Sequence, residues 1–301
     1  MPHSQLAFDF GTTNSLLVAW DEQTKSALPL ELPGLSQSAA SGCPLVPTLL
    51  YVQDGVSGLV TAGQAVRAAG LDQSRDNRLF RNFKRNLLGA GSREPRLIDG
   101  APWTDQDAAR HFLRAVLAVL PCPLGEVQQF VLTVPVAASE TYATWINETM
   151  RALPVPVQII DESTAAALGY AVAQPGATVL VFDFGGGSLD LSLVQLPDRG
   201  SASRGLFKNR SKEEGGGMAR VAAKAGIALG GSDIDQWLLG WALEQCGLSV
   251  ETLGYDYPAL LSACEAAKIA LSQQEKTLLN FTAAGKAYSL VLRRRQFERL
   301  L

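Results

Sequence analysis

The sequence predicts an α/β protein built from two related lobes that face each other across a shared cleft. The main observation is an internal repeat, in which residues 6–20 resemble residues 180–194. Each copy is typical of a β-hairpin: an apolar strand, a tight turn of glycine and small hydroxyl residues, and a second apolar strand. Asp9 or Asp183 stands just before each turn. The second observation is the series of strand and helix patterns between the two copies.

The best-marked element between the repeats is a helix predicted at 105–120. Thr104 can cap its start with Asp107 three residues on, and Pro121 ends it. Further helices are expected at 139–153 and 164–172, and after Pro258. The remaining expected elements are strands at 48–52, 130–134 and 157–160, a joint between lobes at 174–177, and a flexible loop at 215–217.

Composition excludes several classes of protein. The chain has 301 residues, 47% of them hydrophobic, which is enough for two domains with cores. A net charge of -3 favours neither nucleic acid nor an anionic membrane, and no apolar stretch is long enough to span a bilayer. We therefore expect a soluble cytoplasmic protein. Idle thiols, not zinc ligands or disulfides, are expected at the widely spaced Cys43, Cys122, Cys246 and Cys264.

The two predicted turns suit a nucleotide triphosphate. Phosphate oxygens need backbone amides at close range, and glycine allows both the approach and the backbone angles. Gly185–Gly187 supplies such a turn, and Gly11 is followed by the hydroxyls of Thr12 and Thr13. The aspartate before each turn can hold magnesium through water. A single copy would fit an ordinary tight turn equally well, whereas two copies with the same aspartate favour a phosphate site.

Three other segments have both a functional and an ordinary explanation. Glu162 follows a strand and precedes a helix capped by Ser163 or Thr164, and a carboxylate there could order water around a metal or a nucleophile. Taken alone, it is better explained as an ordinary acidic residue at a helix start. Gly230–Gly231 precedes a cap at Ser232, which suits an anion or a plain helix start. The face formed by Glu265, Lys268 and Ser272 suits a ribose and adenine or an exposed ion pair.

Taken in order, these segments resemble the nucleotide-binding domain of DnaK-type heat-shock chaperones, the heat shock protein 70 family. The resemblance runs from residue 6 to 301, and its most specific parts are residues 8–15 and 160–168. It implies an actin-like two-lobed ATPase fold, with a larger and a smaller subdomain in each lobe. Lobe I would span 1–174, with a small subdomain inserted at about 37–110, and lobe II would span 177–301 and be incomplete at its C-terminus.

The same resemblance implies roles for individual residues. Lys84 would position the attacking water, while Asp9, Asp183 or Asp190 would accept its proton, a choice that stays open. Magnesium would be held, mostly through water, by Asp9, Asp183, Glu162 and Asp190. Asp190 and Ser188 would also lie near potassium. The residues expected to bind the nucleotide are Gly11, Thr12, Thr13, Gly185, Gly186, Gly187, Ser188, Gly230, Gly231, Glu265, Lys268 and Ser272.

The implied activity is slow ATP hydrolysis that drives a conformational switch in a chaperone, with ATP or ADP, Mg²⁺ and K⁺ as ligands. Implied partners are client polypeptides, bound by a domain absent from this chain, a J-domain protein and a nucleotide exchange factor. The sequence departs from the family at residues 136–138, which lack two aromatics, at Ser163, which replaces a proline, and at Leu301, where the chain stops. In the family, the first two positions lie near the elements that relay the nucleotide state to the substrate domain, and a fragment is the favoured explanation of the end.

Two other functions fit a two-lobed fold. A sugar kinase would need a carboxylate in the cleft as a base for a substrate hydroxyl, and no sugar-site signature is present. A non-hydrolysing, ATP-dependent scaffold or actin-like assembly protein is the stronger alternative, because the chain is short and the loop at 136–138 is altered.

Overall fold

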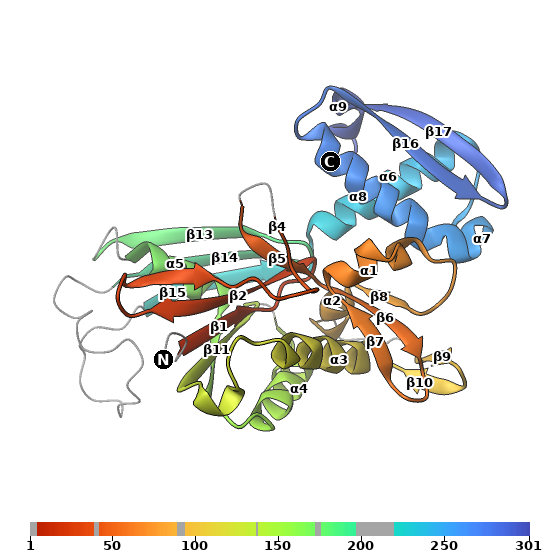
Figure 1. Cartoon of the computed structure of the whole chain (residues 1–301). Coiled ribbons are helices and arrows are strands. Elements are labelled where there is room, and N and C mark those ends of the chain that lie inside the picture. The colour runs from red at the N-terminus through yellow and green to blue at the C-terminus, as the bar shows by residue number, and fades with distance from the viewer. Residues whose placement is uncertain (1–4, 39–41, 89–93, 137, 172–175, 197–219) are drawn as a thin grey trace.

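The computed structural model describes residues 5–38, 42–88, 94–136, 138–171, 176–196 and 220–301 (Figure 1). These residues form an N-terminal body around one large sheet, a three-stranded sheet beside it, and a C-terminal unit of helices and one hairpin. The predicted loop at 215–217 and the start of the predicted joint at 174–177 lie outside the described residues.

The large sheet is mixed and runs in the order β12-β11-β1-β2-β5-β4, with β3 paired to β2. β1 is parallel to β11, and β11 is parallel to β12. The carboxyl ends of these three strands therefore meet at one edge, and Asp9 lies there as the last residue of β1. The seven strands are β1 (Gln5–Asp9), β2 (Asn14–Asp21), β3 (Ser26–Pro29), β4 (Gln37–Ser38), β5 (Pro44–Pro47), β11 (Gln129–Val134) and β12 (Val157–Asp161).

Three helices close the core of this body: α2 (Phe83–Leu88), α3 (Asp105–Ala118) and α4 (Glu140–Arg151). The rings of Phe10, Phe83 and Phe112 pack against one another with centroids 5.7 to 6.3 Å apart, and all three are fully buried. This aromatic cluster fixes α2 directly over the end of β1. The backbone of α2 is therefore held by apolar packing at the edge where Asp9 lies.

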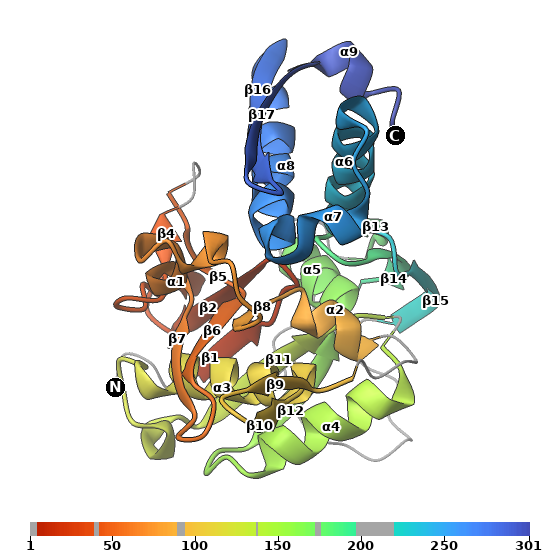
Figure 2. The same cartoon turned by 90° about the vertical axis from the view of Figure 1, so that its right-hand side faces the viewer.

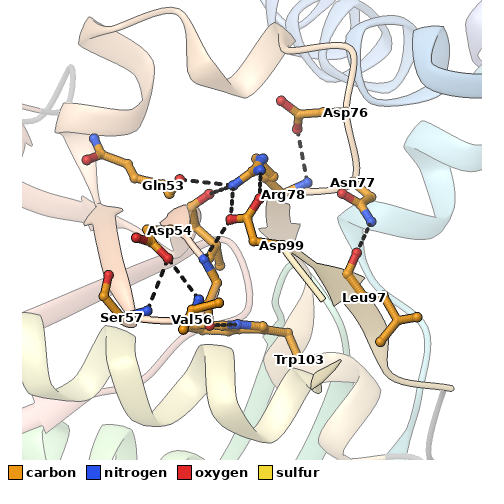
Figure 3. A network of polar contacts seen from close by, with 12 residues as sticks. Gln53, Asp54, Val56, Ser57, Asp76, Asn77, Arg78, Leu97, Asp99 and Trp103 are labelled. Carbon is orange, nitrogen blue, oxygen red and sulfur yellow. Dashed lines mark hydrogen bonds and ion pairs between the residues drawn. The ribbon is translucent and has the colours of Figure 1, made fainter. Parts of the chain in front are cut away.

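Smaller sheets extend the body on one side. β6 (Leu49–Asp54) pairs with β7 (Leu59–Ala62) and β8 (Leu79–Arg81), while β9 (Arg96–Ile98) pairs with β10 (Ala101–Trp103). Figure 3 shows the polar network that joins them: Arg78 forms an ion pair with Asp99, which accepts a hydrogen bond from Gly55 N at 2.9 Å. The Trp103 indole donates to Gly55 O at 3.0 Å. Short elements nearby are α1 (Gln64–Ala68) and the 3-10 turn Leu71–Gln73, and a further 3-10 turn, Leu124–Glu126, stands between α3 and β11.

The second hairpin belongs to an antiparallel sheet of β13 (Thr178–Phe184), β14 (Leu189–Gln195) and β15 (Arg220–Ile227). One face of this sheet packs on α5 (Glu162–Ala171) through Ala167 and Val194. The opposite face is apolar and exposed, and its most exposed side chains are Leu180, Phe182, Phe184 and Ile227. Only one side of this sheet is therefore covered in the described part of the chain.

The C-terminal unit has its own core. Figure 2 shows α6 (Gly231–Cys246) and α8 (Tyr257–Leu271) side by side, with the hairpin of β16 (Lys276–Ala283) and β17 (Lys286–Arg293) against α8. Buried leucines and Cys264 fill the space between these elements. The remaining elements are α7 (Val250–Leu253), the 3-10 turn Gly254–Asp256 and α9 (Arg294–Phe297).

The elements predicted with a clear boundary signal are confirmed. The helix expected at 105–120 is α3, and its capping box joins Thr104 and Asp107 as predicted. The strands expected at 130–134 and 157–160 are β11 and β12, and both predicted hairpins form. In the described part of the chain, no helix has the length and apolarity that crossing a membrane requires.

Candidate functional site

The turns of the two hairpins contact each other directly. A Cβ built on Gly186 would lie 2.1 Å from Thr13 Oγ1, and one on Gly187 would lie 2.6 Å from Thr12 Oγ1. No residue larger than glycine fits at either position without moving the opposite turn. The prediction that the two hairpin turns face each other is confirmed. The turns are close together, because the cavity next to Thr12 and Thr13 has a volume of only about 20 Å³.

The first turn is fixed by its own backbone and by Thr48. A Cβ at Gly11 would lie 1.9 Å from Asn14 O, so this tight turn requires glycine. Thr48 donates from its hydroxyl to Gly11 O at 2.9 Å and from its backbone N–H to Thr13 O at 2.8 Å. The sequence patterns did not single out Thr48, because its role depends on a contact across 37 residues of chain.

The second turn is joined to the start of α6. Gly231 N donates to Gly185 O at 3.0 Å, and Ser232 N donates to Gly186 O at 2.8 Å. A Cβ at Gly230 would lie 2.6 Å from Gly186 C, so the backbones are in close contact. Gly185 N donates to Ser188 O at 2.9 Å and closes the turn. All the glycines predicted to bind phosphate are thus gathered in one place.

The predicted cap at Ser232 is wrong. The cap is Gly230, whose N–H donates to the Asp233 carboxylate at 2.7 Å, and Ser232 lies in the first turn of α6. The Ser232 side chain is nearly buried and donates to Asn82 Oδ1 at 3.2 Å instead. It is held by a residue of the N-terminal body, which a local sequence pattern cannot reveal.

The predicted cap at Ser163 or Thr164 is also wrong. α5 begins at Glu162, immediately after β12, so neither hydroxyl stands before the helix. The Ser163 side chain is fully buried and shares a hydrogen bond of 2.7 Å with Ser192 of β14. Burial against the neighbouring sheet takes the place of capping.

Acidic side chains gather at the strand ends around the turns. Asp9 accepts a hydrogen bond from Thr133 Oγ1 at 2.7 Å, and Asp183 lies opposite Asp190 across β13 and β14. Asp190 is 1% exposed, and neither of its oxygens has a hydrogen-bond partner among the described residues. Burial raises the pKa of Asp183, and the charges of Asp190 and then Asp9 raise it further. These carboxylates repel one another, which a cation between them would relieve.

Lys84 forms a buried ion pair with Glu162. Lys84 Nζ lies 2.7 Å from Glu162 Oε1, and the two side chains are 2% and 15% exposed. The ammonium also lies 5.6 Å from the centre of the Phe10 ring. Burial raises the pKa of Glu162, the charge of Lys84 opposes this, and the charge of Asp9 adds to it. α2 and α5 therefore bring the lysine and glutamate predicted for catalysis into contact.

The predicted adenosine face is brought together only in part. Lys268 Nζ donates to Gly231 O at 2.8 Å and lies 2.7 Å from Asp235 Oδ1, while Glu265 lies 3.9 Å from Arg67. Ser272 is exposed just beyond α8 and donates to Ile269 O of its own turn at 2.6 Å. Glu265 lines a cleft of about 1000 Å³ between the N-terminal body and the C-terminal unit, whereas Ser272 does not.

Several contacts across this cleft escaped the sequence patterns. Arg81 Nη2 lies 2.9 Å from Ser262 Oγ, and Arg75 Nε lies 2.7 Å from Asp256 Oδ1. Asp235 is nearly buried beside Lys268, and burial raises its pKa to about 6. Each of these contacts joins segments far apart in the chain, so the spacing of the residues carried no signal.

The donor set suits a metal held through water better than a metal bound directly. Among the described residues, no group of three or more His, Cys, Asp and Glu side chains is placed to coordinate a metal. The buried, unpartnered carboxylate of Asp190 and the glycine-only contacts of the turns nevertheless fit a hydrated cation and phosphate groups.

Comparison with known proteins identifies relatives along nearly the whole chain. The family model described as Hsp70 protein matches residues 111–301. The chaperone protein HscA of Edwardsiella ictaluri is 30% identical over 92% of this chain, and HscA of Salmonella paratyphi C is 28% identical over 93%. In each case the chain spans 44% of the relative's length. With the family model covering well over half of its residues, the chain belongs to the Hsp70 family.

Proposed function

We propose that this chain binds ATP and hydrolyses it slowly, as the nucleotide-driven switch of an Hsp70-type chaperone. The observation that carries the proposal is the convergence of the buried Lys84–Glu162 pair with the carboxylates of Asp9, Asp183 and Asp190. These groups gather at the ends of two hairpins whose turns admit only glycine at the points of contact. Such an arrangement suits phosphoryl transfer to water, which depends mainly on positioning and charge neutralisation.

The fold that we propose is the actin-like one, with two lobes, each having a larger and a smaller subdomain. Residues 1–174 would form lobe I, with the small sheets at about 37–110 as its inserted subdomain. Residues 177–301 would form the part of lobe II present here. In support, the large sheet and the sheet of β13–β15 each contribute one hairpin, and the cleft of about 1000 Å³ lies beyond the turns.

In this proposal the two turns hold the phosphates between them. The backbone amides of Gly11, Thr12 and Thr13 act from one side, and those of the Gly185–Gly187 turn with Ser188 act from the other. Magnesium, when bound, neutralises charge that develops on the phosphate oxygens. Asp9, Asp183, Glu162 and Asp190 hold it through water, and Asp190 with Ser188 also serves K⁺.

Lys84 is proposed to position the attacking water, with Glu162 fixing its ammonium. The proton of that water passes to Asp9, Asp183 or Asp190. Burial and the neighbouring carboxylates raise the pKa of Asp183, which makes it a stronger base than an ordinary aspartate. The two turns are in contact, so phosphates held between them require the turns to move apart.

The adenosine end is proposed to use Lys268 and Glu265 on α8, together with Gly230 and Gly231. Asp235 and Arg67 belong to the same ionic group, because they pair with Lys268 and Glu265. Ser272 would have to turn away from its present acceptor to reach a ribose. Its contribution is therefore expected to be the smallest of the three.

The chaperone role rests on the relatives, which are named chaperones. We propose client polypeptides, a J-domain protein and a nucleotide exchange factor as partners, and the cytoplasm as location. The clients would bind outside the residues present here. The absence of two aromatics at 136–138 and the serine at 163 are departures from the family at the segments expected to couple the nucleotide site to such a domain.

The test is magnesium-dependent phosphate release by the purified protein, measured alongside ATP affinity by calorimetry. Removing one member of the buried pair also threatens folding, so the informative variant is the double substitution Lys84→Met with Glu162→Gln. We expect it to bind ATP and to lose at least about 100-fold in rate, within the range of positioned catalytic groups. The matched control is Lys276→Met, because Lys276 is an exposed lysine on β16. Equal rates in wild type and double variant would refute the proposal.

A second candidate is an ATP-dependent scaffold that binds without turnover. The observation that favours it is the exposed apolar face of the β13–β15 sheet, with Leu180 and Phe182 each 65% exposed. Large exposed apolar patches mark interaction sites. ATP-dependent light scattering without phosphate release would support this candidate over hydrolysis.

A further inference from the structure

The backbone of Arg81, the last residue of β8, is tied to both hairpin turns. On one side Arg81 pairs with Leu49 of β6, and the residue before Leu49 is Thr48, which holds the first turn by two hydrogen bonds. On the other side Asn82 accepts a hydrogen bond from Ser232 Oγ at 3.2 Å, and Ser232 N donates to the second turn. The place from which the Arg81 side chain starts is therefore fixed by contacts with both turns.

The Arg81 side chain reaches from the N-terminal body to α8. Its Nη2 lies 2.9 Å from Ser262 Oγ, although the two residues are 181 positions apart. Arg81 lines the small cavity beside Thr12 and Thr13, and it also lines the cleft of about 1000 Å³ that Ser262 and Glu265 line. The guanidinium therefore lies where the proposed phosphate turns meet the cleft proposed for adenosine.

The surroundings of this guanidinium favour an anionic ligand. Burial lowers the pKa of Arg81, and the charge of Glu265 is the strongest of the effects that oppose it. Two neighbouring arginines have carboxylate partners, Arg67 with Glu265 at 3.9 Å and Arg75 with Asp256 at 2.7 Å. Arg81 is held by a neutral hydroxyl instead. An anion beside a buried cation offsets the cost of its burial, and phosphate oxygens match the planar fork of a guanidinium.

We propose that Arg81 is a nucleotide-binding residue, whose guanidinium turns from Ser262 to donate hydrogen bonds to phosphate oxygens of bound ATP. The inference rests on the proposed function, because it takes the phosphates to lie between the two turns. It adds a cationic side chain to a phosphate site otherwise made of backbone amides, hydroxyls and a hydrated metal ion. Since Ser262 lies on α8, the same exchange releases one contact between the N-terminal body and the C-terminal unit.

The test compares how wild type and Arg81→Gln bind magnesium-ATP, by calorimetry, and adenosine, by competition. Arg81→Gln should bind magnesium-ATP about 10- to 100-fold more weakly, which is the loss of one charge-assisted hydrogen bond. Its affinity for adenosine, which has no phosphate, should stay within about twofold of wild type. Arg81→Lys keeps the charge without the fork, so its affinity for magnesium-ATP should lie between the two. Thermal unfolding checks that each variant folds, and if Arg81→Gln does not, Arg81→Lys is judged by the same comparison.

Two controls separate phosphate binding from a bridge that only joins the two sides of the cleft. Ser262→Ala removes the present acceptor of Arg81 and should bind magnesium-ATP at least as tightly as wild type. Arg75→Gln removes another arginine that reaches across the cleft and should change this affinity by less than about threefold. Equal losses for magnesium-ATP and adenosine in Arg81→Gln, or no loss for either, would overturn the inference. So would a loss in Ser262→Ala as large as that in Arg81→Gln.

The inference and the proposed activity can fail separately, because the readout is binding and not turnover. A wild type that binds ATP without hydrolysing it would refute the proposed activity, and the affinities would still decide the role of Arg81. A wild type that binds no magnesium-ATP would overturn both.

Discussion

The Lys84–Glu162 pair provides the sharpest test of the energetics of the site. At a separation of 2.7 Å, the attraction between the two charges is about 6 kcal/mol at an effective dielectric constant of about 20. Much of this offsets the cost of burying the charges, but removing one partner leaves the other buried alone. We therefore expect Lys84→Met to lower the free energy of unfolding by about 3–5 kcal/mol at pH 8.

The pH dependence of this loss has a definite sign. Burial already raises the pKa of Glu162, and without Lys84 the opposing effect is gone, so the folded-state pKa rises further. A carboxyl with a raised folded-state pKa binds a proton more tightly when folded, so its contribution to stability grows as the pH falls. The cost of Lys84→Met should therefore be smaller at pH 5.5 than at pH 8. Adding Glu162→Gln should restore at least about 2 kcal/mol at pH 8.

The measurement is urea unfolding followed by circular dichroism at both pH values, with all four members of the double-mutant cycle. Lys276→Met is again the control, because an exposed lysine should change stability by no more than about 0.5 kcal/mol. Strictly additive effects of the two substitutions would refute the reasoning. So would a cost of Lys84→Met that is the same at pH 5.5 and pH 8.

Three further outcomes follow from the described contacts. Gly186→Ala should lower the melting temperature because its Cβ would meet Thr13 Oγ1 at 2.1 Å, and Thr13→Ala should relieve part of the loss. Burial raises the pKa of Asp235 to about 6 despite Lys268, so stability should fall as the pH rises from about 4 to 6, and Asp235→Asn should flatten that slope in urea titrations. Burial raises the pKa of the Cys264 thiol to about 12, so a thiol reagent at pH 8 should leave it unmodified until the protein unfolds, as mass spectrometry would reveal.

The sequence predicted those parts of the fold and site that have a local signature. Gly11 is needed by the turn in which it stands, and Thr104 caps α3 through a residue three positions away. Such requirements are visible in a short window of residues. The two hairpins, the helix α3 and the strands β11 and β12 were therefore predictable.

The parts that could not be predicted depend on contacts between distant segments. Ser163 and Ser232 have the residue type and the position of helix caps, but each side chain is buried against another element. Arg81 and Asp235 occupy ordinary positions at a strand end and on a helix, and their environment is set by segments dozens of residues away. No spacing rule distinguishes them from neighbouring residues.

The contact between the two hairpin turns has a mechanical consequence. Because the carbonyls of Gly185 and Gly186 accept hydrogen bonds from the first residues of α6, the second turn and that helix must move together. The 16 residues of α6 extend about 24 Å from the second turn, so a rotation of about 10° at that turn displaces the far end of the helix by about 4 Å. If the proposed function is right, a phosphate group that moves the turns apart would also move α6, and the outer end of the C-terminal unit would shift more than the turns themselves.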